Sequence, residues 1–248
     1  MAGASSAPGP VLSLDGVDAG YGPLVVLDGA TVSLHPGEVA LVLGANGSGK
    51  STLLKTIMGL TRVSGGRIGF AGTDITAAPP HRRAALGLGY VPQTGNVFSD
   101  LSVIDNLRMG AFLRKDGIEP ALPGLIDLFP RLGERLSARA GALSGGERRM
   151  LSIALTLLLD PRVLLLDEPS SDLAPATVDL VYEAIARIHR ERGIPVLLVE
   201  QNIAKGLSIS DRVVVMVRGR VAAEMAAADV EPARLHDLFM DGGVRVAG

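Results

Sequence analysis

Cysteine is absent from this 248-residue sequence, and aromatic residues make up only 3% of it. A chain without cysteine forms no disulfide and offers no thiolate metal ligand and no cysteine nucleophile. The formal net charge is only -2, which disfavours a nucleic-acid binder held by a broadly basic surface. The composition therefore excludes thiol chemistry and argues against nucleic acid as a partner.

Long apolar runs are also missing. No run approaches the roughly 18 residues that span a bilayer as a helix, and the nearest candidate, residues 153–166, is interrupted by Asp160-Pro161-Arg162. Residues 1–10 have neither the basic start nor the apolar core of a secretory signal, and we interpret them as a short flexible tail. We expect a chain that is soluble when isolated and that reaches a membrane only through a partner.

Hydrophobic residues make up 47% of the chain and charged residues 20%, which is typical of a globular protein. Strand and helix patterns alternate, and this order predicts an α/β fold with a mostly parallel core sheet and helices on its faces. Residues 11–17 and 24–34 mix apolar and polar positions, which favours half-exposed antiparallel strands in an N-terminal β subdomain. Buried strands are predicted at residues 39–43, 88–91, 163–166, 196–199 and 213–217.

The strand pattern disappears at about residues 92–162, where breaks at Pro120, Pro123 and Pro130 separate helical segments. We interpret this region as a helical subdomain inserted into the α/β core. The alternation then resumes and ends in a predicted helix around residues 233–240. No internal repeat and no long linker is visible, so residues 11–248 are expected to form one domain.

One glycine-rich loop carries the strongest chemical signal. It fits G-x-x-x-x-G-K-[ST] and lies between a predicted strand and a predicted helix that continues through Thr52, the context of a phosphate-binding loop. The glycines let the backbone N–H groups point at phosphate oxygens, and the helix N-terminus adds partial positive charge. Lys50 is expected to reach the β- and γ-phosphates, and the Ser51 hydroxyl to bind Mg²⁺. The loop consists of Gly44, Ala45, Asn46, Gly47, Ser48, Gly49, Lys50 and Ser51.

Two acidic residues follow the apolar run Val163–Leu166, and Pro169 then ends the strand. Such residues lie at the carboxyl edge of a sheet, where ligands of open α/β folds bind. We expect Asp167 to hold Mg²⁺, and Glu168 to orient or deprotonate an attacking water.

A second anion site is predicted where Ser144-Gly145-Gly146-Glu147 opens a helix. Ser144 is a good N-cap, and the N–H groups that follow it are free to bind an anion. By itself this pattern is common.

Together, Gly44–Ser51, Leu143–Glu147 and Leu164–Glu168 resemble the hallmarks of the ATP-binding cassette (ABC) ATPases, in which an LSGGQ-like signature lies between Walker A and Walker B. The resemblance extends from about Val11 onward and implies a P-loop NTPase domain that binds ATP and Mg²⁺. By the same resemblance, Tyr21 stacks on adenine, and Gln93 contacts Mg²⁺ and couples the site to a membrane subunit.

The family also implies how two chains assemble. A nucleotide held by Lys50 does not readily reach a signature on the inserted helices of its own chain, so two chains face head to tail. Each γ-phosphate then contacts the partner's signature, which comprises Ser144, Gly145, Gly146 and Glu147. The implied partners are transmembrane permease subunits and a second ATPase subunit, in a heterodimer or a homodimer at the cytoplasmic face of the membrane. Direct contact with the cargo is not expected.

Finer features resemble one branch, the second ATPase subunit of importers for branched-chain and other hydrophobic amino acids. Gln201 stands where many ABC ATPases have a switch histidine; its amide can donate a hydrogen bond to the γ-phosphate but takes up no proton near neutral pH. We therefore count Gln201 with Glu168 and Lys50 as catalytic candidates. The segments that carry this similarity are Gly44-Ala45-Asn46-Gly47, Phe129-Pro130-Arg131-Leu132, Leu173-Ala174-Pro175 and Val199-Glu200-Gln201-Asn202.

Alternatives remain open at this point. Tyr90-Val91-Pro92-Gln93 also resembles the subunits of urea- or amide-type importers. Leu155 stands where the family commonly has arginine, Asp172 replaces a small residue, and Ala174 stands where many cassettes have aspartate, so a poorly hydrolysing regulatory subunit is a second hypothesis. A soluble ABC protein acting on nucleic acid is a third, although the two cassettes or long basic insertions usual for such proteins are not seen.

Overall fold

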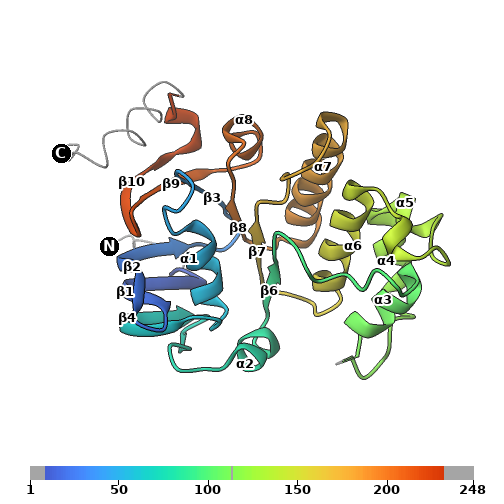
Figure 1. Ribbon diagram of the computed structural model, residues 1–248, viewed down its shortest axis with the longest axis horizontal. Helices are drawn as coiled ribbons and strands as arrows, with labels where there is room; N and C mark the ends of the chain where they lie inside the picture. The colour runs from blue at the N-terminus through green and yellow to red at the C-terminus, as the bar shows by residue number, and fades with distance from the viewer. Residues whose placement is uncertain (1–8, 113, 232–248) are drawn as a thin grey trace, which may run out of the picture.

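The computed structural model describes residues 9–112 and 114–231, which form two β-sheets and a group of helices (Figure 1). The strands are β1 (Leu12–Tyr21), β2 (Leu24–Leu34), β3 (Val39–Leu43), β4 (Arg62–Phe70), β5 (Thr73–Asp74), β6 (Leu88–Val91), β7 (Val163–Asp167), β8 (Val196–Val199), β9 (Arg212–Val217) and β10 (Arg220–Ala226). The helices are α1 (Lys50–Ile57), α2 (Pro80–Ala85), α3 (Val103–Gly110), α4 (Leu122–Leu128), α5 (Pro130–Gly133), α6 (Gly145–Leu157), α7 (Pro175–Arg192) and α8 (Ile203–Leu207), with 3₁₀ turns at Ala140–Ala142 and Ala227–Asp229.

The six-stranded sheet has the order β10-β9-β3-β8-β7-β6. Its strands run parallel except β10, which pairs antiparallel with β9. Every residue of β3, β7 and β8 is buried, because helices or the second sheet cover both faces, and this explains their continuous apolar runs. The prediction of an α/β fold with a mostly parallel core sheet is confirmed, and all five predicted buried strands are present.

The four-stranded sheet is antiparallel and has the order β2-β1-β4-β5. The two antiparallel strands predicted near the N-terminus are confirmed as β1 and β2, although β1 runs on to Tyr21. Strands β4 and β5 were not predicted from the sequence. Three glycines interrupt the pattern of β4, and glycine inside a strand weakens both its pairing and its sequence signal.

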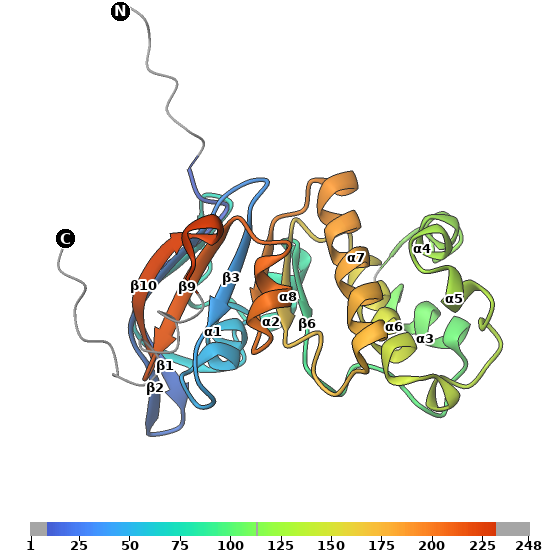
Figure 2. The same cartoon turned by 90° about the horizontal axis from the view of Figure 1, so that it is seen from above.

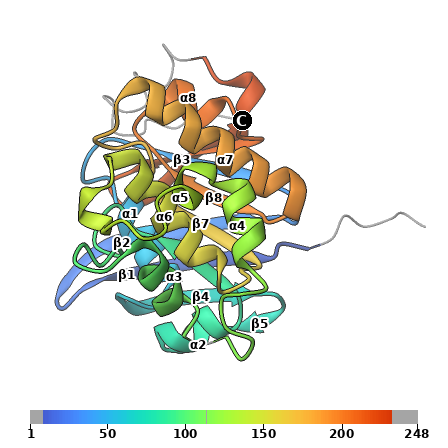
Figure 3. The same cartoon turned by 90° about the vertical axis from the view of Figure 1, so that its right-hand side faces the viewer.

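Helix α1 packs between the two sheets, against β7 on one side and β1, β2 and β4 on the other. Its buried Leu53, Leu54 and Ile57 join the core formed by the inner faces of both sheets. On the opposite face of the parallel sheet, α6 and α7 contribute to a second core that extends to α3, α4 and α5 (Figure 2). Figure 3 shows this helical side of the molecule. Helices α3, α4, α5 and α6 lie together there, and in the sequence they come after β6 and before β7.

Within residues 9–112 and 114–231, every helix is too short or too polar to cross a bilayer. The helix predicted around residues 233–240 and residues 1–8 of the predicted tail lie outside the described residues.

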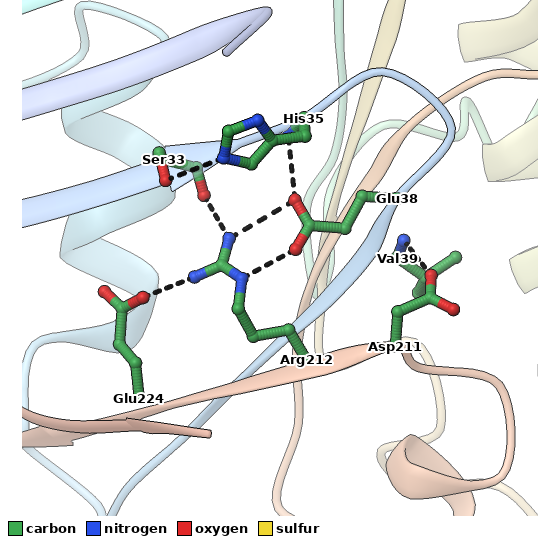
Figure 4. Close-up of polar contacts among 7 residues, drawn as sticks. All are labelled: Ser33, His35, Glu38, Val39, Asp211, Arg212 and Glu224. Atoms are coloured by element: carbon green, nitrogen blue, oxygen red, sulfur yellow. Dashed lines mark hydrogen bonds and ion pairs between the residues drawn. The ribbon is translucent and has the colours of Figure 1, made fainter. Parts of the chain in front are cut away.

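A partly buried ion pair joins the two sheets at the start of β9 (Figure 4). Arg212 Nε lies 2.6 Å from Glu38 Oε1, and its other nitrogens donate to Glu224 Oε2 at 2.6 Å and to the Ser33 carbonyl at 2.5 Å. Glu38 also accepts the His35 backbone N–H at 2.7 Å. Burial acts to raise the pKa of Glu38, but its hydrogen bonds to Arg212 and His35 lower that pKa overall. The charged form of Glu38 is therefore the form that the fold stabilises.

Replacing Arg212 by methionine is expected to lower the free energy of unfolding by about 3 kcal/mol at neutral pH, because it leaves the buried Glu38 carboxylate without its cation. The depressed pKa of Glu38 contributes stability above its unfolded value of about 4.3, and that contribution is lost as the pH falls through the folded value. Urea unfolding between about pH 7 and about pH 3 should therefore show a smaller difference between variant and wild type at the acidic end, below about pH 4.3.

Arg220→Met is the matched control, since it breaks the ion pair with Asp28, whose side chain is 52% exposed. We expect this loss to be below about 1 kcal/mol. Equal losses for the two arginine variants would contradict the role given to the Arg212 network.

Candidate functional site

The predicted phosphate-binding loop connects β3 to α1, as expected. Gly49 directly precedes the helix with φ of 103°, a backbone conformation that favours glycine. The N-terminus of α1 has no side-chain cap and no acidic residue in its first turn, so its first N–H groups are available to an anion. Ser48 Oγ is buried and has no hydrogen-bond partner among the described residues. These features fit a bound phosphate group.

The Lys50 side chain turns back toward the first residues of this loop. Its Nζ donates to the carbonyl oxygens of Gly44 at 2.9 Å and Ala45 at 3.2 Å. Burial lowers the pKa of Lys50, while the carboxylates of Glu168 and Asp167 act in the opposite direction. The ammonium group therefore lies between the loop backbone and the acidic edge of the sheet, where terminal phosphates of a nucleotide are expected.

The turn between β9 and β10 is hydrogen-bonded to the same loop. This contact was not predicted from the sequence. The Gly219 N–H donates to the Ser48 carbonyl at 2.8 Å. Arg218 and Gly219 have φ of 49° and 80°, as in the two-residue turns of tight hairpins. A side chain at Gly219 would bring a Cβ to 1.9 Å from the Val26 carbonyl oxygen. Arg-Gly between two apolar runs is a recognisable turn signal, but nothing in the sequence says that the turn reaches residue 48.

Ser51 and Asp167 meet at the edge of the sheet although they lie on different elements. The Ser51 hydroxyl donates to Asp167 Oδ1 at 2.8 Å, and the Tyr90 hydroxyl donates to Asp167 Oδ2 at 3.2 Å. Burial raises the pKa of Asp167, and the hydrogen bonds from Ser51 and Tyr90 partly offset that effect. Mg²⁺ prefers oxygen ligands and shares them with phosphates and water, so this hydroxyl and carboxylate pair fits the predicted magnesium site.

Glu168 lies beside this pair and contacts the amides of Gln93 and Gln201, which were predicted to contact Mg²⁺ and the γ-phosphate respectively. Gln201 Nε2 is 2.8 Å from Glu168 Oε1 and 3.0 Å from Oε2, and Gln93 Nε2 is 3.2 Å from Oε2. Of the predicted metal ligands, Gln93 thus contacts Glu168, while Ser51 and Asp167 contact each other. The arrangement holds one carboxylate in a fixed orientation next to the expected phosphates.

Two acids in this segment have unusual backbone conformations. Glu168 has φ of 45° and Asp172 has φ of 60°, both in the left-handed region. For residues other than glycine this conformation costs about 1–2 kcal/mol, and such strain clusters at functional sites. The left-handed backbone conformation of Glu168 is consistent with its prediction as a catalytic residue.

The signature segment forms the predicted helix start. Ser144 and Glu147 make a reciprocal capping box, in which the Glu147 carboxylate accepts the Ser144 N–H at 2.8 Å. That hydrogen bond is the main reason why the pKa of Glu147 is lowered. Gly145 and Gly146 pack against Leu173 and Thr177 at the start of α7. Figures 1 and 2 place α6 and α1 on opposite sides of β6 and β7, so one chain does not bring its signature and phosphate loop together.

Helix α6 is hydrogen-bonded along one side to the segment that carries Gln93. Arg149 donates to the carbonyls of Pro92 at 2.8 Å and Gln93 at 2.7 Å. One turn later Ser152 Oγ donates to Asn96 Oδ1 at 2.7 Å, and at the end of the helix Thr156 Oγ1 donates to the Tyr90 carbonyl at 3.3 Å. We refer to these three contacts as the α6 seam. No sequence pattern indicates these contacts, because they join residues far apart along the chain and most of the acceptors are backbone carbonyls.

The remaining predicted residues lie as follows. Tyr21, predicted to stack on adenine, ends β1 and is 43% exposed. Thr52 is buried in the first turn of α1. Leu155 packs toward Gly110 at the end of α3, so the departure from arginine lies in the helical core and not beside Glu168. Ala174 directly precedes α7 and makes no side-chain cap.

Known proteins resemble this chain both in sequence and in structure. The profile of the ABC transporter family matches residues 27–171. The probable branched-chain amino acid transport ATP-binding protein LivF of Archaeoglobus fulgidus is 41% identical over 83% of this chain and 88% of its own length. The high-affinity branched-chain amino acid transport ATP-binding protein BraG of Pseudomonas aeruginosa is 38% identical over 94% of this chain and 100% of its own length.

Solved structures agree on the fold. A nucleotide-free ATP-binding cassette from an ABC transporter aligns with a TM-score of 0.80 and 26% identity, covering 94% of this chain and 95% of its own. An ATP-binding subunit of an ABC transporter aligns with a TM-score of 0.79 and 27% identity, covering 93% and 99%. A dimeric bacterial cassette, with a TM-score of 0.77 at 20% identity over 87% and 98% of the two chains, supports the fold alone.

Lys50→Ala is expected to raise the dissociation constant for ATP about 10- to 100-fold, because it removes a hydrogen-bonding charge from the phosphates. Equilibrium titration with a fluorescent ATP analogue measures this. Lys55→Ala, on the last turn of the same helix, is the matched control and should change affinity less than about threefold. Unchanged affinity in Lys50→Ala would contradict the assignment of the loop.

Proposed function

This chain belongs to the ABC transporter family, and from that membership we propose that it is the ATP-hydrolysing subunit of an importer for branched-chain or other hydrophobic amino acids. The family assignment makes the chain an ABC ATPase. The cargo rests on similarity to LivF and BraG, whose names specify branched-chain amino acid transport and whose lengths this chain covers to 88% and 100%.

One observation supports the proposed chemistry above all others. The Glu168 carboxylate is held by the amides of Gln93 and Gln201 beside the Ser51 and Asp167 pair. In the proposed mechanism Lys50 and the N–H groups at the start of α1 hold the terminal phosphates. Glu168 orients the attacking water and accepts its proton, while Gln201 fixes the carboxylate. Ser51 and Asp167 would hold Mg²⁺, which would supply charge stabilisation for the phosphate oxygens.

Assembly is part of the proposal. Since α6 and α1 lie on opposite sides of β6 and β7, a second ATPase subunit would complete each site with its own Ser144–Glu147. ATP then lies within the interface, and hydrolysis removes a contact between the subunits. We propose a heterodimer, with a homodimer as the alternative, bound to permease subunits at the cytoplasmic face of the membrane. The helical region from about residue 92 to 162 is the proposed part that meets the permease.

A poorly hydrolysing regulatory subunit is the second candidate, favoured by Asp172 with its left-handed backbone. Against it, Leu155 packs into the helical core, and the contacts among Glu168, Gln93 and Gln201 are intact. We therefore favour an active ATPase.

Glu168→Gln separates the two candidates when it is measured in the complex with the permease and the second ATPase. We expect the variant to lower kcat about 10²- to 10⁴-fold, because the amide cannot accept the proton of the water. ATP affinity and ATP-dependent dimerisation should stay close to wild type. Glu183→Gln, an exposed acid on α7, is the control and should leave hydrolysis unchanged. Wild-type turnover in Glu168→Gln would remove this residue from the mechanism.

The cargo is tested separately by uptake into proteoliposomes that contain the complete complex and its external binding protein. We expect ATP-dependent accumulation of leucine that competes with isoleucine and valine and is lost with Glu168→Gln. Accumulation of urea or a short amide without leucine uptake would overturn the proposed cargo and leave the ATPase assignment in place.

A further inference from the structure

Glu200 directly follows β8 and precedes Gln201, and the proposed chemistry gives it no role. Glu200 is buried, with only 1% of the residue exposed. Oε1 accepts the Ser170 backbone N–H at 3.0 Å. Oε2 accepts the backbone N–H groups of Gln201 at 3.0 Å and Asn202 at 3.3 Å. One buried carboxylate therefore binds two different stretches of backbone.

Those two stretches carry the groups that meet at the site. Ser170 follows Glu168 by two positions, with Pro169 between them, and Gln201 bears the amide that contacts both oxygens of Glu168. The Glu168 N–H also donates to the Val199 carbonyl at 2.9 Å. The positions of Glu168 and Gln201 relative to each other thus depend on the short path through Val199, Glu200 and Ser170.

The negative charge of Glu200 suits this task better than a neutral amide would. A carboxylate accepts at both oxygens, whereas a glutamine side chain accepts at one end and donates at the other. Within residues 9–112 and 114–231, Glu200 takes part in none of the ion pairs, so backbone N–H groups are its observed partners. Hydrogen bonds from backbone N–H groups to a carboxylate are stronger than those between neutral groups.

Helix α7 closes the site around this carboxylate. The Tyr182 hydroxyl is buried and has no hydrogen-bond partner among the described residues. Burial raises the pKa of Tyr182, and the nearby charge of Glu200 raises it further. The carboxylate is therefore enclosed by β8, the segment after Glu168 and α7, and is not placed to contact a nucleotide.

We propose that Glu200 is a positioning residue, which holds the loop bearing Gln201 against the segment bearing Glu168 so that the two side chains stay in contact. The proposal rests on the proposed function, in which Glu168 activates the water. Glu200 acts through Gln201, and its loss lets the Glu168 carboxylate turn away from the orientation needed for proton transfer. A misplacement of about 1 Å at such a contact can cost about 10²-fold in rate.

The test compares Glu200→Gln, Glu200→Asp, Gln201→Ala and the double variant Glu200→Gln with Gln201→Ala, each in the complete transporter complex. We expect Glu200→Gln to lower kcat about 10- to 100-fold, with the KM for ATP within about threefold of wild type. Glu200→Asp keeps the charge on a shorter side chain and should recover part of the rate. The double variant should be less than about threefold slower than Gln201→Ala, because the two residues act as one unit.

Glu38→Gln is the matched control, since Glu38 is also a buried acid but lies in the Arg212 network. It should lower the unfolding temperature without changing kcat. A general loss of stability therefore lowers the unfolding temperature, whereas a loss of positioning lowers kcat.

Wild-type kcat in Glu200→Gln beside a slow Gln201→Ala would overturn the proposal, as would a double variant whose loss is the product of the two single losses. If Glu200→Gln does not assemble, Glu200→Asp decides, and its wild-type kcat would equally overturn the proposal. Failure of the proposed function looks different, because Glu168→Gln and Gln201→Ala would then both hydrolyse ATP at the wild-type rate.

Discussion

The parallel register of β3, β8 and β7 is the constraint on which the rest of the site depends. Val42 lies opposite Val199, and Val199 lies opposite Asp167, so three strands from distant parts of the sequence end at one level. The chain leaves β3 into the phosphate loop, β7 into Glu168 and β8 into Glu200 and Gln201. Parallel strands present their carboxyl ends at the same edge, and the crossover helices that parallel pairing requires cover the faces. Strand pairing therefore brings these three segments to the same edge of the sheet.

Much of this arrangement was predictable, because the features concerned are local. Buried strands leave continuous apolar runs, and the loop Gly44–Ser51 carries its own spacing of glycines, lysine and serine. What the sequence did not reveal are contacts between residues far apart along the chain. The Tyr90 hydroxyl on Asp167, the Gly219 N–H on the Ser48 carbonyl and the Glu200 carboxylate on the Ser170 N–H leave no periodicity. The strand β4 was missed for another reason, since its glycines hide an alternating pattern.

Buried charge follows two different rules in this protein. At the far end of β3 and β9, Glu38 is paired with a guanidinium, and the result is cohesion between the sheets. Near the phosphate loop, Asp167 receives hydroxyl groups and Glu200 receives backbone N–H groups. A carboxylate satisfied by neutral donors keeps its negative field, whereas one paired with arginine has most of that field cancelled. The site thus retains a negative potential at the expected position of Mg²⁺ and near the ammonium group of Lys50.

The α6 seam has a mechanical consequence. Its three contacts, at Arg149, Ser152 and Thr156, span seven positions of helix, or about 10 Å at 1.5 Å per residue. Over this length α6 is held against residues 90–96. Because of these contacts, a rotation of the helical region that carries α6 also displaces the backbone of Gln93. The side-chain amide of Gln93 donates a hydrogen bond to Glu168. Helix α6 therefore connects the helical region, which we propose contacts the permease, to Glu168, which we propose activates the water.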